Sequence, residues 1–201
     1  MAIEYEATFP RVNKDKIRVR LHDIGAVLEY PETLQKRSNF DPPQNKDNSS
    51  WLRVRDEGRG VITMSYKTVP DKADVISQQK EICLRVNSFE DAKSFLVSLG
   101  CREKSYQETR RELWRIGKVE ITIDEWPFLV PFLEIESDSE VVVKNIAEKL
   151  GYDYREALFC NVFYLYSQQY NIPIDDLKKM VSGELGHLTF SSENPFSRQK
   201  K

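Results

Sequence analysis

The chain has 201 residues, of which 40% are hydrophobic and 31% are charged. This composition supports a folded domain with its own core and excludes an intrinsically disordered protein. Lys plus Arg number 30 and Asp plus Glu number 32, for a formal net charge of -2. The whole-chain charge therefore gives no general attraction to nucleic acid or to an acidic membrane, and we expect neither as a partner.

Cysteine usage and the N-terminal segment indicate the cellular compartment to expect. Three cysteines without C-x-x-C spacing and two histidines indicate neither a disulfide framework nor a zinc site. The segment MAIEYEATFP carries glutamates where a signal peptide needs an apolar run, and the longest apolar stretch, Leu158 to Tyr166, is interrupted by Asn161. We therefore expect a cytoplasmic protein without a membrane-spanning segment.

The first predicted element is a helix. An apolar stripe recurs every three or four residues from Ile17 to Leu28, which predicts a helix that begins near Asn13 and is ended by Pro31. The stretch from Ser38 to Ser50 is rich in Pro, Asn, Asp and Ser and predicts a loop.

Later helices have clearer signals. Ser88 opens a capping-box-like S-F-E-D, and the apolar stripe that follows ends at Gly100, as expected of a helix with defined caps. Helical patterns then dominate residues 138–190, and we expect a disordered polar tail over residues 191–201.

Strand patterns fill the regions between the helices. Seven segments alternate apolar and polar residues with a period of two: IEYEATF, WLRVR, GVITMSYK, KEICLRV, RRELWR, VEITIDEW and FLEIES. Helices and strands are interspersed without regular βαβ alternation, so we expect an α+β fold in one domain over residues 1–201. In this fold an antiparallel sheet curls toward a closed β-barrel, and the helices pack outside it.

Charges are distributed unevenly over the polar faces of these strands. Carboxylates gather on the first and last strands, whereas Arg and Lys gather on the middle ones. For a single strand, a polar face in water is the ordinary explanation. The segregation of signs favours a closed sheet with its charged face inside, and a polyphosphate with a divalent metal would satisfy both signs in such a tunnel.

The same segments, taken in order, resemble the CYTH superfamily, also called triphosphate tunnel metalloenzymes. This superfamily includes class IV adenylyl cyclases, thiamine triphosphatases and inorganic triphosphatases. The matching marks run over roughly the whole chain: the ExExK-like IEYEATF, LRVR, SYK, RELWR, VEITIDEWP and FLEIE. The resemblance implies an eight-stranded antiparallel closed barrel that binds a triphosphate in its interior.

The resemblance also implies roles for individual residues. The implied ligands of Mg²⁺ or Mn²⁺ are Glu4, Glu6, Asp124, Glu134 and Glu136. The implied substrate-binding cations are Arg53, Arg55, Lys67 and Arg111. The implied catalytic groups are Glu4, Glu6 and Lys67.

Two departures from the family pattern concern charge. Thr8 stands where the N-terminal motif normally has Lys, and the strand after Lys67 has Cys83 and Arg85 where the family often has glutamates. Arg85 would restore positive charge if its side chain lies on the inner face.

Three functions fit this reading. The first is metal-dependent hydrolysis of inorganic, nucleoside or thiamine triphosphate. The second is a class IV adenylyl cyclase that converts ATP to cyclic AMP and pyrophosphate. The third is a non-catalytic triphosphate-binding protein. The expected partner is a small-molecule triphosphate, and homodimer formation is left open.

Overall fold

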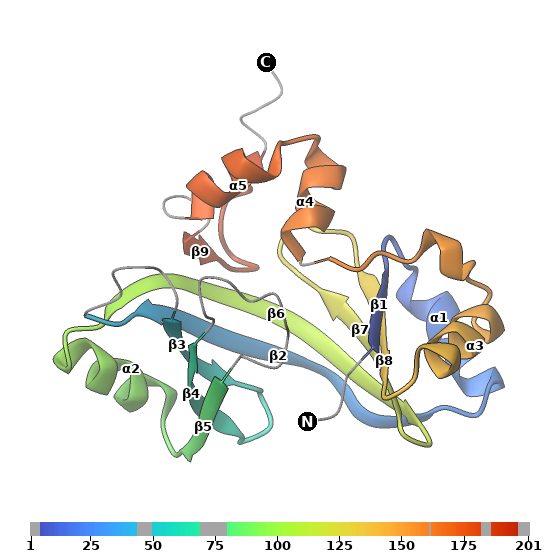
Figure 1. Cartoon of the computed structure of the whole chain (residues 1–201), viewed down its shortest axis with the longest axis horizontal. Coiled ribbons are helices and arrows are strands. Elements are labelled where there is room, and N and C mark those ends of the chain that lie inside the picture. Colours follow the sequence, from blue (N-terminus) through green and yellow to red (C-terminus); the bar gives the residue numbers. More distant parts are fainter. Residues whose placement is uncertain (1–4, 44–49, 69–79, 161, 182–185, 197–201) are drawn as a thin grey trace. The chain divides into compact units, whose positions relative to one another are not determined.

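The structure is a computed structural model that describes residues 5–43, 50–68, 80–160, 162–181 and 186–196 (Figure 1). Its strands are β1 (Tyr5–Phe9), β2 (Val27–Asp41), β3 (Ser50–Asp56), β4 (Ile62–Thr68), β5 (Lys80–Val86), β6 (Arg102–Ile116), β7 (Val119–Glu125), β8 (Phe132–Ser137) and β9 (His187–Leu188). Its helices are α1 (Lys14–Asp23), α2 (Phe89–Ser98), α3 (Glu140–Lys149), the 3₁₀ helix η2 (Tyr154–Glu156), α4 (Val162–Tyr170) and α5 (Ile174–Val181). The α+β class and the large antiparallel sheet are confirmed.

Hydrogen bonds join the strands in the order β1-β8-β7-β6-β2-β3-β4-β5, and β9 pairs in parallel with β6. Among the residues that the structure describes, β1 and β5 are not neighbours, so the sheet is not closed by hydrogen bonds. The outer edge of β1 has a different partner. The Thr8 amide donates to the Leu158 carbonyl at 3.0 Å, and the Leu158 amide donates to the Thr8 carbonyl at 2.9 Å.

The chain divides into two compact units, Met1–Thr33 with Thr109–Leu177 and Leu34–Glu108 with Lys178–Lys201. The first unit contains β1, β7, β8, α1, α3 and α4, and the second contains β3, β4, β5 and α2. The long strands β2 and β6 contribute residues to both units.

The boundary between α1 and β2 corrects the predicted first helix. The helix begins after Asn13 as predicted, but Gly25 ends it with a φ of 80°. The Ala26 amide donates to the Leu21 carbonyl at 2.9 Å, which is the bond of a Schellman cap. Extension of the helix to Pro31 is therefore wrong, because the chain beyond this cap enters β2.

The predicted loop over Ser38 to Ser50 is also partly wrong. β2 continues through Asp41, and β3 begins at Ser50. Pairing explains the difference, since Ser38 lies opposite Val54 in the register of β2 with β3. Residues 44–49 of the predicted loop lie outside the described part of the chain.

In the first unit, the apolar face of the sheet forms the core. Helix α3 packs on β8 and β1, and α1 lies beside it (Figure 1). Burial follows the predicted alternation, since Ala7, Ile121 and Ile135 have no exposed surface. Two carboxylates share this face, and both are paired with cations of α1: Glu112 accepts from the guanidinium of Arg18 at 2.7 Å, and Glu125 pairs with the Lys14 ammonium.

In the second unit, α2 packs on β3 and β4. The predicted cap is confirmed, because the Ser88 hydroxyl oxygen accepts from the Asp91 amide at 3.1 Å. The helix buries its stripe against Phe40 and Val54 from the sheet. The described part of the C-terminal tail, residues 191–196, ends in Phe196, which is 2% exposed. Within the described residues, no helix is both long enough and apolar enough to span a membrane.

Candidate functional site

One face of the sheet in the first unit carries a row of three carboxylates. The register of β1 with β8 sets Glu6 opposite Glu136, and the register of β8 with β7 sets Glu136 opposite Glu120. Opposite residues on antiparallel strands have Cβ atoms about 4.5–5.5 Å apart, so like charges in these positions repel. Arg115 ends the row on β6 and donates to Glu120 at 2.7 Å. At Glu6 and Glu136, a bound cation would reduce the repulsion.

A second cluster, centred on Arg111, lies on β6, β7 and β8. The Arg111 Nε donates to Oδ1 of Asp124 at 2.7 Å, and Nη2 donates to Oδ2 of Asp124 at 3.0 Å. The same Nη2 also donates to Oε2 of Glu134 at 2.9 Å. The Thr122 hydroxyl donates to Oδ2 of Asp124 at 2.6 Å. Arg111 therefore binds two of the predicted carboxylates at once, and its fork geometry fixes both of them.

Burial shifts the proton equilibria of this cluster. The Asp124 side chain is 2% exposed and that of Glu134 is 21% exposed. Burial, and next the charge of Asp124, raise the pKa of Glu134 to about 8, although the charge of Arg111 acts in the opposite direction. For Arg111, burial favours the neutral form, but the charges of Asp124 and Glu134 outweigh it and raise its pKa. The guanidinium is therefore charged at every accessible pH.

Cys160 lies near the same carboxylates and was not predicted from the sequence. Burial, and then the negative charges of Glu134 and Glu6, raise the pKa of its thiol. A thiol in this environment stays protonated near neutral pH, and a protonated thiol is a poor metal ligand. No spacing motif marks this cysteine in the sequence, because the carboxylates that surround it come from distant strands.

The carboxylates fit a divalent metal of the Mg²⁺ type. Within the described residues, no three His, Cys, Asp or Glu side chains converge on one point. Mg²⁺ does not require such a cage, because it usually retains several waters and binds one or two carboxylates together with substrate phosphates. Glu6 and Glu136 lie opposite each other on β1 and β8 and could provide those two carboxylates. Asp124 and Glu134 are both ion-paired with Arg111. Glu4 lies outside the described residues.

In the second unit, the predicted cations share one face of β3 and β4. Arg53 and Arg55 are two residues apart on β3, so their side chains project to the same side. Lys67 joins them, because Arg53 lies opposite Ser65, two residues before Lys67 on β4. The Lys67 ammonium also lies 5.8 Å from the ring centroid of Trp51, within reach of a cation–π interaction.

The registers add two arginines to this face. Arg37 on β2 lies opposite Arg55 on β3. Arg55 also lies opposite Thr63 on β4, and Thr63 lies opposite Arg85 on β5. Arg85 therefore lies on the same face as the predicted cations of this unit. Arg37 was not predicted, since the segment around it lacks a period of two and its place follows only from pairing with β3.

The substitution of Thr8 for the family's lysine changes the first unit. Thr8 lies opposite Glu134 in the register of β1 with β8 and is 2% exposed. A neutral hydroxyl thus faces a carboxylate at the position where the family has an ammonium group. Arg111 remains as the cation that is hydrogen-bonded to Glu134.

An antiparallel sheet with carboxylates on β1, β8 and β7 and cations on β2, β3, β4 and β5 defines the class of protein described here. The CYTH domain family model matches residues 2–158. The chain belongs to this family. No curated protein matches the chain.

Several solved structures share the fold. The PH1012 protein from Pyrococcus horikoshii OT3 is 22% identical, with a TM-score of 0.61, and the alignment covers 81% of this chain and 99% of that one. A putative adenylate cyclase from Vibrio parahaemolyticus is 16% identical, with a TM-score of 0.65 and coverage of 83% and 98%. A putative adenylyl cyclase from Hippeastrum, described as having a dominant triphosphatase activity, is 14% identical, with a TM-score of 0.57 and coverage of 87% and 99%.

Proposed function

We propose that the protein is a divalent-metal-dependent phosphohydrolase that acts on a triphosphate. The observation that carries the proposal is the separation of charge. Carboxylates form a row across β1, β8 and β7, and five cations share one face of β2 to β5. A triphosphate with a bound metal presents both complementary signs in one ligand. The family also implies that the sheet encloses its substrate as an eight-stranded tunnel, and we include this closed form in the proposal.

In this proposal the acidic row holds Mg²⁺ or Mn²⁺. Glu6 and Glu136 are the proposed ligands, with Glu4 as a further candidate from the same motif. A bound Mg²⁺ or Mn²⁺ neutralises phosphate oxygens and lowers the pKa of water. We assign Glu6 to orienting the attacking water and accepting its proton, since its carboxylate is exposed on β1.

The basic face is assigned to the phosphates. Arg53 and Arg55 have the fork geometry that binds phosphate oxygens bidentately, and Lys67 supplies a compact charge. These three cations would stabilise the charge on the transferred phosphoryl group and its leaving group. Arg111 was predicted to bind substrate as well. Its two carboxylate partners support a positioning role instead, in which it holds Asp124 and Glu134 in place.

A class IV adenylyl cyclase is the second candidate. The Vibrio parahaemolyticus neighbour, named a putative adenylate cyclase, supports it. The Hippeastrum neighbour carries a cyclase name together with a dominant triphosphatase activity, which supports hydrolysis. The replacement of a lysine by Thr8 supports a third reading, a binding protein without turnover.

A product assay distinguishes these candidates. The protein is incubated with inorganic triphosphate, ATP or thiamine triphosphate, with Mg²⁺, Mn²⁺ or EDTA, and phosphate, pyrophosphate and cyclic AMP are measured. We expect metal-dependent phosphate release without cyclic AMP. Stoichiometric appearance of cyclic AMP and pyrophosphate from ATP would establish the cyclase, and binding without any product would establish the non-catalytic protein.

Two variants give this assay its control. We expect Glu136→Gln to reduce phosphate release at least tenfold, because it removes one of two carboxylates from the metal ligands. Glu156→Gln removes an equal charge from an exposed position in η2 and should retain wild-type rates. Equal rates for the two variants would contradict the assignment of the acidic row.

A further inference from the structure

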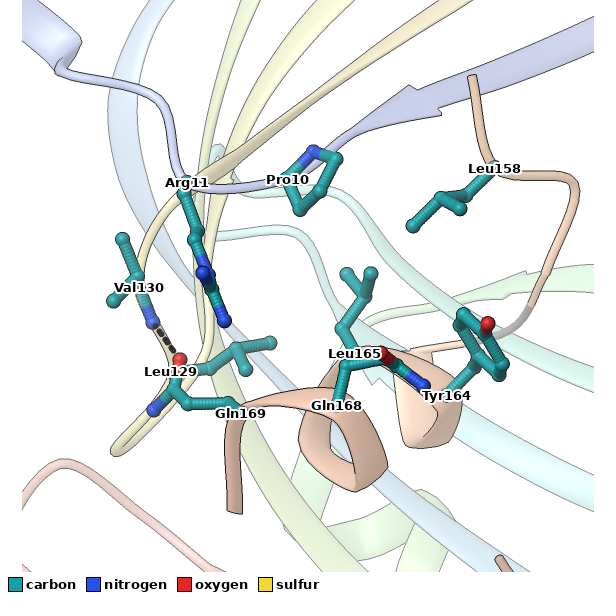
Figure 2. A pocket seen from close by; sticks show the side chains of 9 residues that line it. All are labelled: Pro10, Arg11, Leu129, Val130, Leu158, Tyr164, Leu165, Gln168 and Gln169. Carbon is teal, nitrogen blue, oxygen red and sulfur yellow. Dashed lines mark hydrogen bonds between the residues drawn. The ribbon is translucent and has the colours of Figure 1, made fainter. Parts of the chain in front are cut away.

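A pocket of about 280 Å³ lies in the first unit, apart from the acidic row (Figure 2). It is bounded by the turn that follows β1, by the loop between β7 and β8, and by α4. Its apolar walls include Leu129, Leu158 and Leu165. Helix α4 lies beyond residues 2–158, which the CYTH model matches, so the family domain supplies only part of this pocket.

The walls of the pocket are held in place by hydrogen bonds. The Tyr166 hydroxyl donates to the Pro127 carbonyl at 2.7 Å, and Nε2 of Gln169 donates to the Phe128 carbonyl at 2.7 Å. The Val130 amide donates to Oε1 of Gln169 at 3.0 Å, and this bond is drawn in Figure 2. Helix α4 is therefore fixed to the loop, and a ligand would enter a pocket that already exists.

Three polar side chains line this pocket without a hydrogen-bond or ion-pair partner in the described part of the chain. They are the Arg11 guanidinium, the Tyr164 hydroxyl and the Gln168 amide. Figure 2 shows Arg11 extending from its turn toward α4, with Gln168 and Tyr164 on the facing side of the pocket. These are hydrogen-bonding groups beside apolar walls, which is the composition of sites that bind small ligands.

The backbone at Arg11 supports a functional role. Arg11 has a φ of 59°, in the left-handed region that costs a residue with a Cβ atom of the order of 1 kcal/mol. The chain is held there by the next residue, since the Val12 amide donates to the Pro131 carbonyl at 2.8 Å. A strained backbone thus aims the guanidinium, and such strain is concentrated at ligand sites.

Charge and size define the ligand. Arg11 is the only ionic side chain among the residues that line the pocket, and no carboxylate is among them. A single guanidinium matches one planar carboxylate. A volume of about 280 Å³ corresponds to about nine water-sized groups at about 30 Å³ each. It lies just below the range of about 300–1,000 Å³ that drug-sized ligands occupy.

We propose that this pocket binds a small organic carboxylate of about benzoate size. The carboxylate would accept hydrogen bonds from Arg11 and from the polar groups of Tyr164 and Gln168. The apolar body would lie between Leu129 and Leu165, which are 7% and 5% exposed. The site is separate from the proposed phosphohydrolase and does not depend on it.

Titration of the full-length protein with benzoate, followed by amide chemical shifts, tests the proposal. We expect saturable shifts at the turn around Arg11 and in α4, with a Kd of about 1 mM for a ligand of this size. Benzyl alcohol has a similar ring without the charge and should bind at least tenfold more weakly. Absence of saturable benzoate shifts at this pocket, or equal affinity for benzyl alcohol, would overturn the proposal.

Variants assign the site. Arg11→Gln should weaken benzoate binding at least tenfold, and Gln168→Trp should abolish it by placing a bulky ring at the lining of the pocket. Arg155→Gln, at an exposed arginine of the same unit, should leave it unchanged. Unaltered benzoate binding by Arg11→Gln and Gln168→Trp, or a loss of benzoate binding in Arg53→Gln, would overturn the assignment of benzoate to this pocket. Tighter binding of phenyl phosphate than of benzoate would overturn the carboxylate assignment.

Discussion

Arg111 is the shared hydrogen-bond donor of the two carboxylates beside it. Its guanidinium bonds both oxygens of Asp124 and one oxygen of Glu134, so two acidic groups from separate strands share one cation. Removal of the cation leaves a carboxylate that is only 2% exposed without its partner. A buried charge without a partner is far more costly than a surface charge.

We therefore predict that Arg111→Gln lowers the free energy of unfolding by about 2 kcal/mol. This is less than the about 3–5 kcal/mol of fully buried pairs, because 37% of the Arg111 side chain is exposed. Arg110→Gln, at the neighbouring position on β6, breaks a more exposed ion pair with Glu125 and should cost less than about 1 kcal/mol. Urea denaturation of both variants tests the prediction, and equal losses would contradict it.

Glu134 should make stability depend on pH. Its pKa is raised from 4.5 to about 8 by burial and then by the charge of Asp124. Between these two values the folded state holds a proton that the unfolded state has released. The free energy of unfolding of the metal-free protein should therefore fall as pH rises through this window and level off above it.

Denaturation in EDTA at a series of pH values measures this slope. In Glu134→Gln the titrating group is gone, so we expect the free energy of unfolding to depend less on pH. At pH 8 the variant should be more stable than the wild-type protein. Glu156→Gln, at an exposed carboxylate, should keep the wild-type slope. The same slope in Glu134→Gln as in the wild-type protein would contradict the assignment.

Helices α2 and α3 differ in whether a side chain accepts a hydrogen bond from a backbone amide of the first turn. Ser88 caps α2 through its side chain, with a hydrogen bond of 3.1 Å to the Asp91 amide. Ser139 occupies the same position before α3, where its side chain makes no cap hydrogen bond. The same residue type in two equivalent positions thus isolates the contribution of one capping bond.

Ser88→Ala should lower the free energy of unfolding by about 1 kcal/mol, the usual cost of a lost N-cap. Ser139→Ala should change it by a few tenths of a kcal/mol at most, because no capping bond is lost. Thermal or urea denaturation compares the two variants. A larger loss for Ser139→Ala would show that the caps are not the determining difference.

Local patterns predicted some elements and failed for others. The alternation in segments such as VEITIDEW predicted strand β7 and its charged face, because from Val119 to Asp124 the apolar residues of that strand all lie on one face and the polar residues on the other. Strand β2 was missed, since spacing from Ile17 to Leu28 fits a helix until Gly25 ends it. Pro31 then lies inside a strand, where local propensity is overridden by pairing with neighbouring strands.

From the sequence, the candidate site could be predicted only to the extent of which face of each strand carries the charged residues. Parity along each strand placed Glu136 and Arg53 on charged faces, and the registers agree with it. The partners of Arg111 and the position of Arg37 depend on register between strands distant in sequence, which a local pattern does not encode. The raised pKa of Glu134 likewise comes from burial in the folded state.

At the scale of the whole molecule, the proposed function assigns the metal to the acidic strands and the phosphates to the basic strands. A triphosphate that contacts both would depend on the metal through Glu6 and Glu136 and on direct charge through Arg53, Arg55 and Lys67. The two sets of residues should therefore affect binding in different ways. The acidic set determines the gain that Mg²⁺ provides, and the basic set determines affinity with or without it.

Calorimetric titration with inorganic triphosphate, in Mg²⁺ and in EDTA, measures both quantities most directly. We expect the wild-type protein to bind more tightly in Mg²⁺, Arg53→Gln to lose at least tenfold in affinity under both conditions, and Glu136→Gln to lose the gain from Mg²⁺. Wild-type affinities for Arg53→Gln together with an unchanged Mg²⁺ effect in Glu136→Gln would contradict the account.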